Sequence, residues 1–314
     1  MTVNDAPRFS FDTASAINQG ARDYQEDAII FDFSSGADLN FVVLADGMGG
    51  HAAGDVASKI VVTEMFSKLT FRCGDTAKFK SDIPNALQDA AMCANDRLKE
   101  HVAGHPDTQG MGATLVSAVF IDGLLYWISV GDSPMYLFRD GALTQLNEDH
   151  SMAKTIDMMV QSGTLSEEEG SNHPDRNVLT SVLFGEPIPH VDCPAEPMQL
   201  QAGDTLIVAS DGLQFLEHRY IEQVLRERPF SSSSQIADVL VSSLKKLNDP
   251  DLDNISLSVT QVSNARQDDF GLHQECAVEE AYVEKQSLFQ SMIKSRRLRA
   301  LRRESGPTSG TPCE

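Results

Sequence analysis

The order of the expected strands and helices constrains the fold of this chain more than any other feature. Strands come in runs, because apolar or alternating stretches predict them at 9–18, 28–33, 40–45, 113–121, 124–130, 135–138, 143–146, 205–209 and 255–262. Helical spacing of apolar residues predicts paired helices, 51–69 with 83–102 and 220–226 with 234–247, and another at 151–161. Strands and helices do not alternate as a parallel sheet requires. The order therefore predicts an α+β fold of antiparallel sheets covered by helices, with an irregular stretch at 163–195.

Charge and composition exclude several classes of protein. The 314 residues carry a net charge of −21, which argues against nucleic-acid binding because that binding depends on Lys and Arg. Apolar runs such as 41–45 are far shorter than the ~20 residues that span a bilayer, so no integral membrane segment and no secretory signal is expected. The five cysteines are widely spaced and form no Cys-x-x-Cys pair, which fits a reducing compartment. We expect a cytoplasmic protein.

The end of the chain differs in charge from the rest. Residues 285–314 carry seven basic and two acidic side chains, a net charge of +5, whereas the preceding residues carry −26. Leu288, Met292, Leu298 and Leu301 fall on one helical stripe, so we predict a basic amphipathic helix at 279–303 after a linker at 263–278 and before a disordered tail at 304–314. A solvated helix, docking on an acidic partner or on the acidic body, and binding to a membrane surface are the alternatives.

Acidic residues lie at the ends of five expected strands. Apolar strands run into Asp46, Asp132 and Asp211, while Glu26-Asp27 and Asp253 come just before strands. Asp and Gly are also common in turns, so any one of these positions is weak evidence. Five such positions together favour a site in which these acidic residues meet at one edge of a sheet. Carboxylates brought together in this way repel one another unless a cation neutralises them.

The chemistry of these residues points to a divalent-metal hydrolase. Carboxylate oxygens suit Mg²⁺ or Mn²⁺ better than zinc, and two such ions can clamp a phosphoryl group and supply hydroxide at neutral pH. Arg22 lies four residues before Glu26, and its guanidinium matches two phosphate oxygens. The sequence has no Gly-x-Ser-x-Gly elbow and no Cys-x5-Arg, which disfavours a covalent mechanism. It also has no Gly-x-x-x-x-Gly-Lys phosphate loop.

Eight short motifs occur in an order that resembles a known family. They are Arg22-Asp-Tyr-Gln-Glu-Asp27, Asp46-Gly-Met-Gly-Gly-His51, Met111-Gly-Ala-Thr114, Gly131-Asp-Ser133, Asp149-His-Ser151, Asn177-Val-Leu-Thr180, Ser210-Asp-Gly212 and Asp253-Asn254. Over residues 9–262 the chain resembles the metal-dependent protein serine/threonine phosphatases of the protein phosphatase 2C (PPM) family, in their compact bacterial form. The resemblance implies a four-layer α-β-β-α sandwich, with two antiparallel sheets flanked by helix pairs. It also implies a phosphatase domain at 1–262 with a flap at 151–190.

The resemblance also implies roles for individual residues. Asp46, Asp211 and Asp253 would hold one Mn²⁺ or Mg²⁺, and Asp46, the Gly47 carbonyl and Glu26 would hold a second. Asp132, with Asp211, matches a third and looser site, Asp27 supports the ligands, and Arg22 matches the phosphate-binding arginine. Bridging hydroxide would then attack phosphorus in line, without a phosphoenzyme. The implied substrates are phosphoserine and phosphothreonine proteins, targets of a serine/threonine kinase.

Two residues depart from the family pattern. Met48 stands where some members carry a histidine proposed as general acid, and His51 is expected to be structural. Pro134 replaces the arginine of the usual Gly-Asp-Ser-Arg. These departures keep open the alternative of a pseudophosphatase that binds phosphoproteins without turnover. A phosphatase of small phosphorylated metabolites is a third possibility.

Overall fold

The computed structural model describes residues 9–33, 39–49, 52–72, 76–229 and 231–265. The chain divides into two compact units, Met1–Asn264 and Ala265–Glu314, and the fold described below is that of the first. The helix predicted at 279–303 and the tail at 304–314 lie outside the described residues, as does nearly all of the linker at 263–278. These three segments remain predictions.

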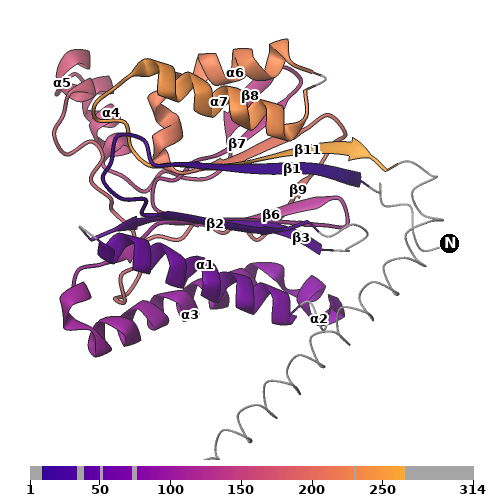
Figure 1. Ribbon diagram of the computed structural model, residues 1–314, viewed down its shortest axis with the longest axis horizontal. Coiled ribbons are helices and arrows are strands. Elements are labelled where there is room, and N and C mark those ends of the chain that lie inside the picture. Colours follow the sequence, from indigo (N-terminus) through magenta and orange to yellow (C-terminus); the bar gives the residue numbers. More distant parts are fainter. Residues whose placement is uncertain (1–8, 34–38, 50–51, 73–75, 230, 266–314) are drawn as a thin grey trace, which may run out of the picture. The chain divides into compact units, whose positions relative to one another are not determined.

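Two antiparallel sheets form the centre of the first unit (Figure 1). The first sheet has the order β1 (Phe9–Asn18), β11 (Ile255–Asn264), β10 (Thr205–Ala209), β7 (Met135–Arg139) and β8 (Ala142–Gln145). The second has the order β2 (Asp27–Asp32), β3 (Leu39–Met48), β5 (Leu115–Ile121), β6 (Leu124–Val130) and β9 (Met198–Gln199), and β4 (Gly112–Ala113) pairs with the end of β3. Every paired strand is antiparallel to its neighbour.

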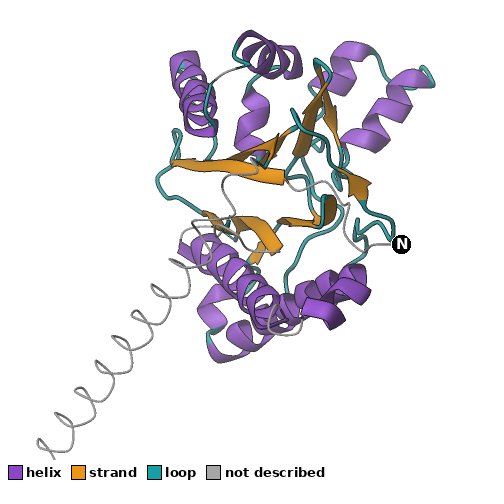
Figure 2. Cartoon of the chain, turned by 90° about the vertical axis from the view of Figure 1, so that its right-hand side faces the viewer, coloured by secondary structure: helices purple, strands orange, loops and turns teal. Residues whose placement is uncertain are grey.

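Helices cover the outer face of each sheet. The long helices α1 (Ala52–Arg72) and α3 (Ile83–Gly104) pack on the second sheet, and short α2 (Thr76–Ser81) lies between them in the chain. The first sheet is covered by α6 (His218–Glu227) and α7 (Ser233–Leu247). Seen from the side, the helices lie above and below the strands (Figure 2). The predicted four-layer sandwich is confirmed.

The apolar core has three parts, one for each contact between layers. Alternation along β3 shows why, since Val42 and Leu44 face the first sheet, whereas Phe41 and Val43 face α1 and α3. The central part joins the two sheets, and the outer two join each sheet to its helices. A strand buried on both faces reads as a continuous apolar run, which is the pattern that predicted it.

Two hairpins follow directly from Asp-Gly pairs. Asp122 and Gly123 join β5 to β6, and Asp140 and Gly141 join β7 to β8, and all four residues have positive φ of 51°, 76°, 52° and 82°. A type I′ turn requires positive φ at both positions, and Asp-Gly meets this requirement at low cost.

The structure corrects several expected boundaries. The strand predicted at 113–121 is broken at Thr114 into β4 and β5, and β3 continues through Asp46 to Met48 because β4 pairs with its last two residues. The stretch predicted to be irregular contains α5 (Glu167–Ser171), which follows α4 (Ala153–Gln161). Ser166 and Glu169 cap α5 reciprocally, and this local signal was missed because the helix is so short.

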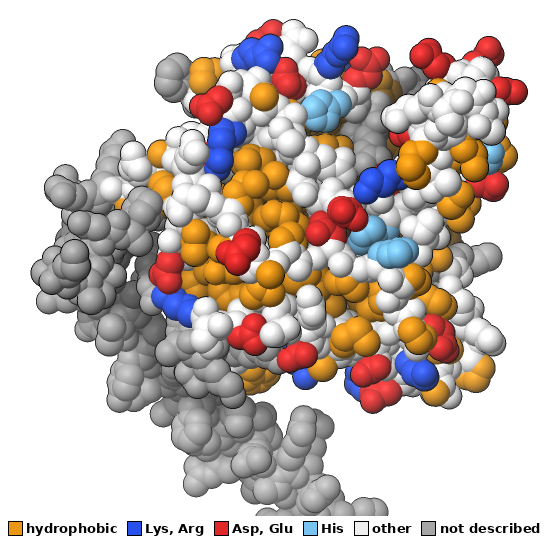
Figure 3. Space-filling model, turned by 180° about the vertical axis from the view of Figure 1, so that it is seen from behind, with side chains coloured by type: hydrophobic (Ala, Val, Ile, Leu, Met, Phe, Trp, Pro, Cys, Tyr) orange, Lys and Arg blue, Asp and Glu red, His pale blue; other side chains and the backbone are white. Residues whose placement is uncertain are grey.

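Seen from the side opposite to Figure 1, hydrophobic side chains gather in a band across the middle of the surface, with charged side chains mostly around it (Figure 3). Within the described residues, no helix is long and apolar enough to cross a membrane.

Candidate metal centre

The chain crosses from one sheet to the other between β1 and β2, and the predicted site lies at this crossing (Figure 1). Asp27 begins β2 and lies directly opposite Asp46 near the end of β3. The Ser210 hydroxyl, just beyond β10 in the first sheet, donates a 2.8 Å hydrogen bond to Asp27 Oδ2. Burial raises the pKa of the Asp27 carboxyl to about 7, although the Ser210 hydrogen bond opposes that rise.

The main chain of Asp46 is held in place by hydrogen bonds to Thr114, so the carboxylate is not needed to fix the residue. Thr114 Oγ1 accepts a 3.0 Å hydrogen bond from the Asp46 N–H, and the Thr114 N–H donates to the Asp46 carbonyl at 2.8 Å. The Thr114 and Ser133 hydroxyls are hydrogen-bonded at 2.7 Å, which links Asp46 to the turn that carries Asp132. Burial raises the Asp46 pKa well above its usual range, and the carboxylates of Asp27 and Asp211 add to the rise.

Asp132 and Asp211 contribute two further, half-buried carboxylates. Asp132 follows β6, and burial with the nearby Asp211 carboxylate raises its pKa to about 7. Asp211 begins a 3-10 helix (Asp211–Phe215), where burial with the Asp253 carboxylate raises its pKa to about 6. Because each of these carboxylates raises the pKa of another, the residues form one electrostatic cluster.

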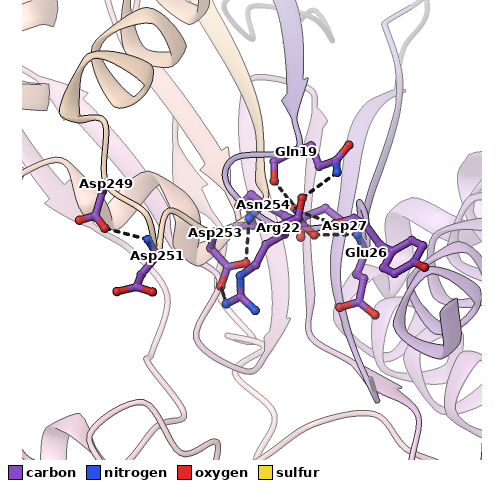
Figure 4. A network of polar contacts seen from close by, with 10 residues as sticks. Gln19, Arg22, Glu26, Asp27, Asp249, Asp251, Asp253 and Asn254 are labelled. Carbon is purple, nitrogen blue, oxygen red and sulfur yellow. Dashed lines mark hydrogen bonds and ion pairs between the residues drawn. The ribbon is translucent and has the colours of Figure 1, made fainter. Parts of the chain in front are cut away.

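Arg22 and Asp253 form an ion pair at the exposed side of this cluster (Figure 4). Arg22 Nη2 lies 2.5 Å from Asp253 Oδ2, and the Asn254 N–H donates to Asp253 Oδ1 at 2.7 Å. The Arg22 side chain is 54% exposed, so its guanidinium can still reach an incoming anion.

Glu26 and Gly47 are packed against the first turn of α1. A Cβ at Gly47 would lie 2.0 Å from the Gly54 carbonyl oxygen, and a Cβ at Gly54 would lie 2.5 Å from Glu26 Oε1. Only glycine permits this approach of strand and helix. Burial raises the pKa of the Glu26 carboxyl, and the Gly54 main chain next to it opposes the rise.

Three oxygens of the carboxylate cluster offer unsatisfied electron pairs to a cation. Glu26 Oε1, Asp27 Oδ1 and Asp211 Oδ1 are buried and have no hydrogen-bond partner among the described residues. Buried carboxylate oxygens without donors are costly, and a hard cation such as Mg²⁺ or Mn²⁺ satisfies them. Within the same residues, no three His, Cys, Asp or Glu side chains are already grouped at ligand spacing. The residues fit cations by charge, burial and donor type, and the ligand of each ion remains a prediction.

Residues 14–254 match the family described as protein phosphatase 2C. The chain belongs to this family. The serine/threonine protein phosphatase PstP of Mycobacterium tuberculosis is 34% identical over 177 residues, which are 56% of this chain and 32% of that protein. The serine/threonine phosphatase stp of Listeria innocua is 33% identical over 202 residues, which are 64% of this chain and 77% of that protein.

A solved structure of a related phosphatase also matches the fold of this chain. It is the catalytic domain of the serine/threonine protein phosphatase PstP in complex with two manganese ions, with a TM-score of 0.65 and 29% identity. The match covers 82% of this chain and 100% of that one. These findings confirm the predicted family and fold. The chain spans about a third of the length of the mycobacterial relative.

The predicted site residues lie near one another, but no three acidic side chains among the described residues are grouped at ligand spacing, so their roles stay predictions. These residues are Arg22, Glu26, Asp27, Asp46, Gly47, Asp132, Asp211 and Asp253. Thr114, Ser210 and Asn254 lie within the sequence motifs, which predict no role for them. All three bind main-chain or carboxylate groups of the cluster. The sequence signal that could have indicated their role was their position within a motif or next to a predicted ligand.

The two departures from the family pattern are both visible. Met48 ends β3, is 40% exposed and has no proton to donate. The Pro134 carbonyl accepts a 3.0 Å hydrogen bond from the Ala209 N–H, which joins its turn to the end of β10. Asn147 holds the same turn by accepting from the Met135 N–H at 2.7 Å and donating to the Ser133 carbonyl at 2.9 Å. The turn is therefore anchored without the family's arginine. His51 lies outside the described residues.

Proposed function

We propose that this protein removes phosphate from phosphoserine and phosphothreonine side chains of proteins, with a centre of two Mn²⁺ or Mg²⁺ ions. The observation that carries the proposal is the carboxylate cluster, in which three buried oxygens lack hydrogen-bond partners among the described residues, beside an exposed arginine. Carboxylates select hard cations, and the guanidinium selects a phosphate dianion. One surface therefore offers both halves of a phosphomonoesterase site.

The proposal assigns the ligands as the family resemblance does. Asp46, Asp211 and Asp253 hold one ion, and Asp46, the Gly47 carbonyl and Glu26 hold the other. Asp132 and Asp211 provide the site for an optional third ion. When bound, the ions polarise the phosphoryl oxygens and lower the pKa of water, so that hydroxide is available at neutral pH.

The remaining steps belong to side chains of this chain. The exposed Arg22 guanidinium orients the phosphate through paired N–H donors. Asp27, fixed by Ser210, adds negative charge next to Asp46 and so strengthens cation binding. Met48 is exposed and cannot donate a proton, so the leaving oxygen is not protonated by this residue.

The proposal also covers the partners, the location and the domain bounds of the protein. We propose protein targets of a serine/threonine kinase as substrates, and an acidic partner for the basic segment at 279–303. Cys93 and Cys193 are free thiols in the part of the chain that the structure describes, which supports a cytoplasmic location. The phosphatase domain is assigned to 1–262 and its flap to 151–190.

Phosphate release from a phosphothreonine peptide tests the proposal. The assay compares Mn²⁺ with EDTA, and wild type with Asp211→Asn. Asp140→Asn is the matched control, because this residue lies in the β7–β8 turn with φ of 52°, a conformation that Asn tolerates. We expect release that requires Mn²⁺, is lost in Asp211→Asn and is kept in Asp140→Asn. Tight phosphopeptide binding without release would instead support the pseudophosphatase, and faster turnover of small phosphate esters would support a metabolite phosphatase.

A further inference from the structure

Asn254 binds three main-chain groups of the segment that connects the two sheets. Its Nδ2 donates to the Gln19 carbonyl at 2.8 Å and to the Tyr24 carbonyl at 2.9 Å, and its Oδ1 accepts from the Glu26 N–H at 2.7 Å (Figure 4). The residue is only 5% exposed. Both donors of the amide are therefore in use, together with its acceptor.

The segment that Asn254 holds carries two of the residues assigned above. Arg22 and Glu26 both lie between Gln19 and the start of β2. Other bonds contribute, since the Ala21 N–H donates to the Leu252 carbonyl at 2.8 Å and Gln25 Nε2 donates to the Asn18 carbonyl at 3.0 Å. Asn254 is distinguished by contacting the segment at its start, its middle and its end.

The main chain of Asn254 also fixes the partner of Arg22. Its N–H donates to Asp253 Oδ1 at 2.7 Å, which leaves Oδ2 to Arg22 at 2.5 Å. One residue thus sets the direction of the Asp253 carboxylate and the position of the segment that faces it.

We propose that Asn254 is a positioning residue, which sets the spacing of Arg22 and Glu26 relative to Asp253 and thereby the affinity for Mn²⁺ and for phosphate. The inference rests on the proposed function, because it takes those residues as ligands of ions and phosphate. Groups that orient metal ligands typically change metal affinity by about 10–100-fold when they are removed.

Asn95 provides a matched control for a purely structural asparagine. It is 3% exposed and also makes three main-chain hydrogen bonds, accepting from the Phe184 and Gly185 N–H groups at 3.1 and 2.9 Å and donating to the Glu186 carbonyl at 2.8 Å. These bonds fix the 184–186 segment to α3, and none involves a residue of the cluster. Loss of either amide leaves a similar number of main-chain groups without partners.

The experiment compares Asn254→Ala, Asn254→Asp and Asn95→Ala with wild type in the full chain. Mn²⁺ binding is followed by the electron paramagnetic resonance of free Mn²⁺, stability by thermal unfolding in EDTA, and phosphate affinity by inhibition with inorganic phosphate. We expect Asn254→Ala to weaken Mn²⁺ binding about 10-fold or more and phosphate inhibition in parallel. Asn95→Ala is expected to lower the unfolding temperature comparably and to leave Mn²⁺ affinity within about twofold.

Asn254→Asp carries the same test if Asn254→Ala does not fold. It keeps the acceptor for the Glu26 N–H but places oxygen against the Gln19 and Tyr24 carbonyls, so we expect it to weaken phosphate inhibition as well. Wild-type Mn²⁺ affinity in a folded Asn254 variant would overturn the positioning role alone. Wild type that neither binds Mn²⁺ nor releases phosphate would overturn the proposed function and this inference together.

Discussion

The Arg22 guanidinium lies 2.5 Å from the Asp253 carboxylate, so the predicted phosphate ligand is paired with a predicted metal ligand. Asp253 Oδ2 cannot bind the Arg22 guanidinium and a metal ion equally well. Substrate binding and metal binding therefore respond differently to the loss of this arginine.

Arg22→Ala is expected to raise KM for a phosphothreonine peptide about 10-fold or more, because charge-assisted hydrogen bonds to the phosphate are lost. Mn²⁺ affinity is expected to stay the same or to rise, since Asp253 Oδ2 no longer pairs with a cation. Steady-state kinetics and a Mn²⁺ titration measure the two effects. Arg97→Ala, which removes an exposed pair with Glu100 on α3, is the control and is expected to change neither. Weaker Mn²⁺ binding in Arg22→Ala would contradict this account of the pair.

The raised carboxyl pKa values predict a pH dependence of stability for the metal-free protein. The pKa of Asp132 is raised from 3.8 to about 7, so the folded state keeps a proton that the unfolded chain releases in this interval. Stability associated with that proton is fully present below about pH 4 and is lost as the pH rises towards 7. We expect the unfolding temperature in EDTA to be higher at about pH 5 than at about pH 8, and Asp132→Asn to reduce this difference by about 3 °C or more.

Two comparisons check the origin of that effect. Asp140→Asn makes the same chemical change in the β7–β8 turn and is expected to keep the wild-type pH dependence. Mn²⁺ at about pH 8 is expected to raise the unfolding temperature, because bound cations replace the protons. An unfolding temperature that rises with pH in wild type but not in Asp132→Asn would show that the sign is wrong.

Most of the fold was predictable from the sequence because its strands are buried on one or both faces. Continuous apolar runs such as 41–45 and Asp-Gly pairs such as Asp122-Gly123 are local signals, and the structure agrees with both. The break at Thr114 was not predictable in this way. It depends on hydrogen bonds with Asp46, which is 68 residues distant in the chain.

The acidic members of the site were likewise predictable, since each carboxylate lies next to a recognisable strand. The groups that position them were not, because Ser210 and Asn254 act on Asp27 and Glu26 across the two sheets. A polar side chain in a motif does not show which distant main-chain group it binds. These residues meet only because the fold brings the ends of strands from the two sheets next to each other.

Ser210→Ala is expected to destabilise the protein by roughly 1–3 kcal/mol for each buried group left without a partner. The hydroxyl donates to Asp27 Oδ2 at 2.8 Å and accepts from the Ser256 N–H at 2.9 Å, so two such groups result. Ser129→Ala is the control, because the buried Ser129 hydroxyl has no hydrogen-bond partner within the described residues. Denaturant unfolding in EDTA should show a clear loss for Ser210→Ala and little change for Ser129→Ala. Equal losses would mean that the Ser210 hydrogen bonds contribute nothing specific.

Gly54→Ala is expected to crowd two oxygens that are assigned to an ion. Alanine is favoured over glycine within a helix by up to about 1 kcal/mol, so α1 itself gains. The new Cβ would nevertheless lie 2.5 Å from Glu26 Oε1 and 2.8 Å from the Gly47 carbonyl oxygen, and both oxygens are assigned to an ion. We expect Mn²⁺ affinity to fall about 10-fold, and the unfolding temperature in EDTA to fall as well, because the Gly47 carbonyl belongs to the main chain and cannot move aside without cost.

Gly104→Ala, at the last residue of α3, makes the same substitution in open space. It is expected to leave Mn²⁺ affinity unchanged, so that any loss in Gly54→Ala is due to the crowded oxygens and not to the added methyl group itself. Titration of both variants with Mn²⁺ makes the comparison. Wild-type affinity in a folded Gly54→Ala would remove Glu26 and the Gly47 carbonyl from the metal site, and would leave Asp46, Asp211 and Asp253 as its only assigned ligands apart from Asp132.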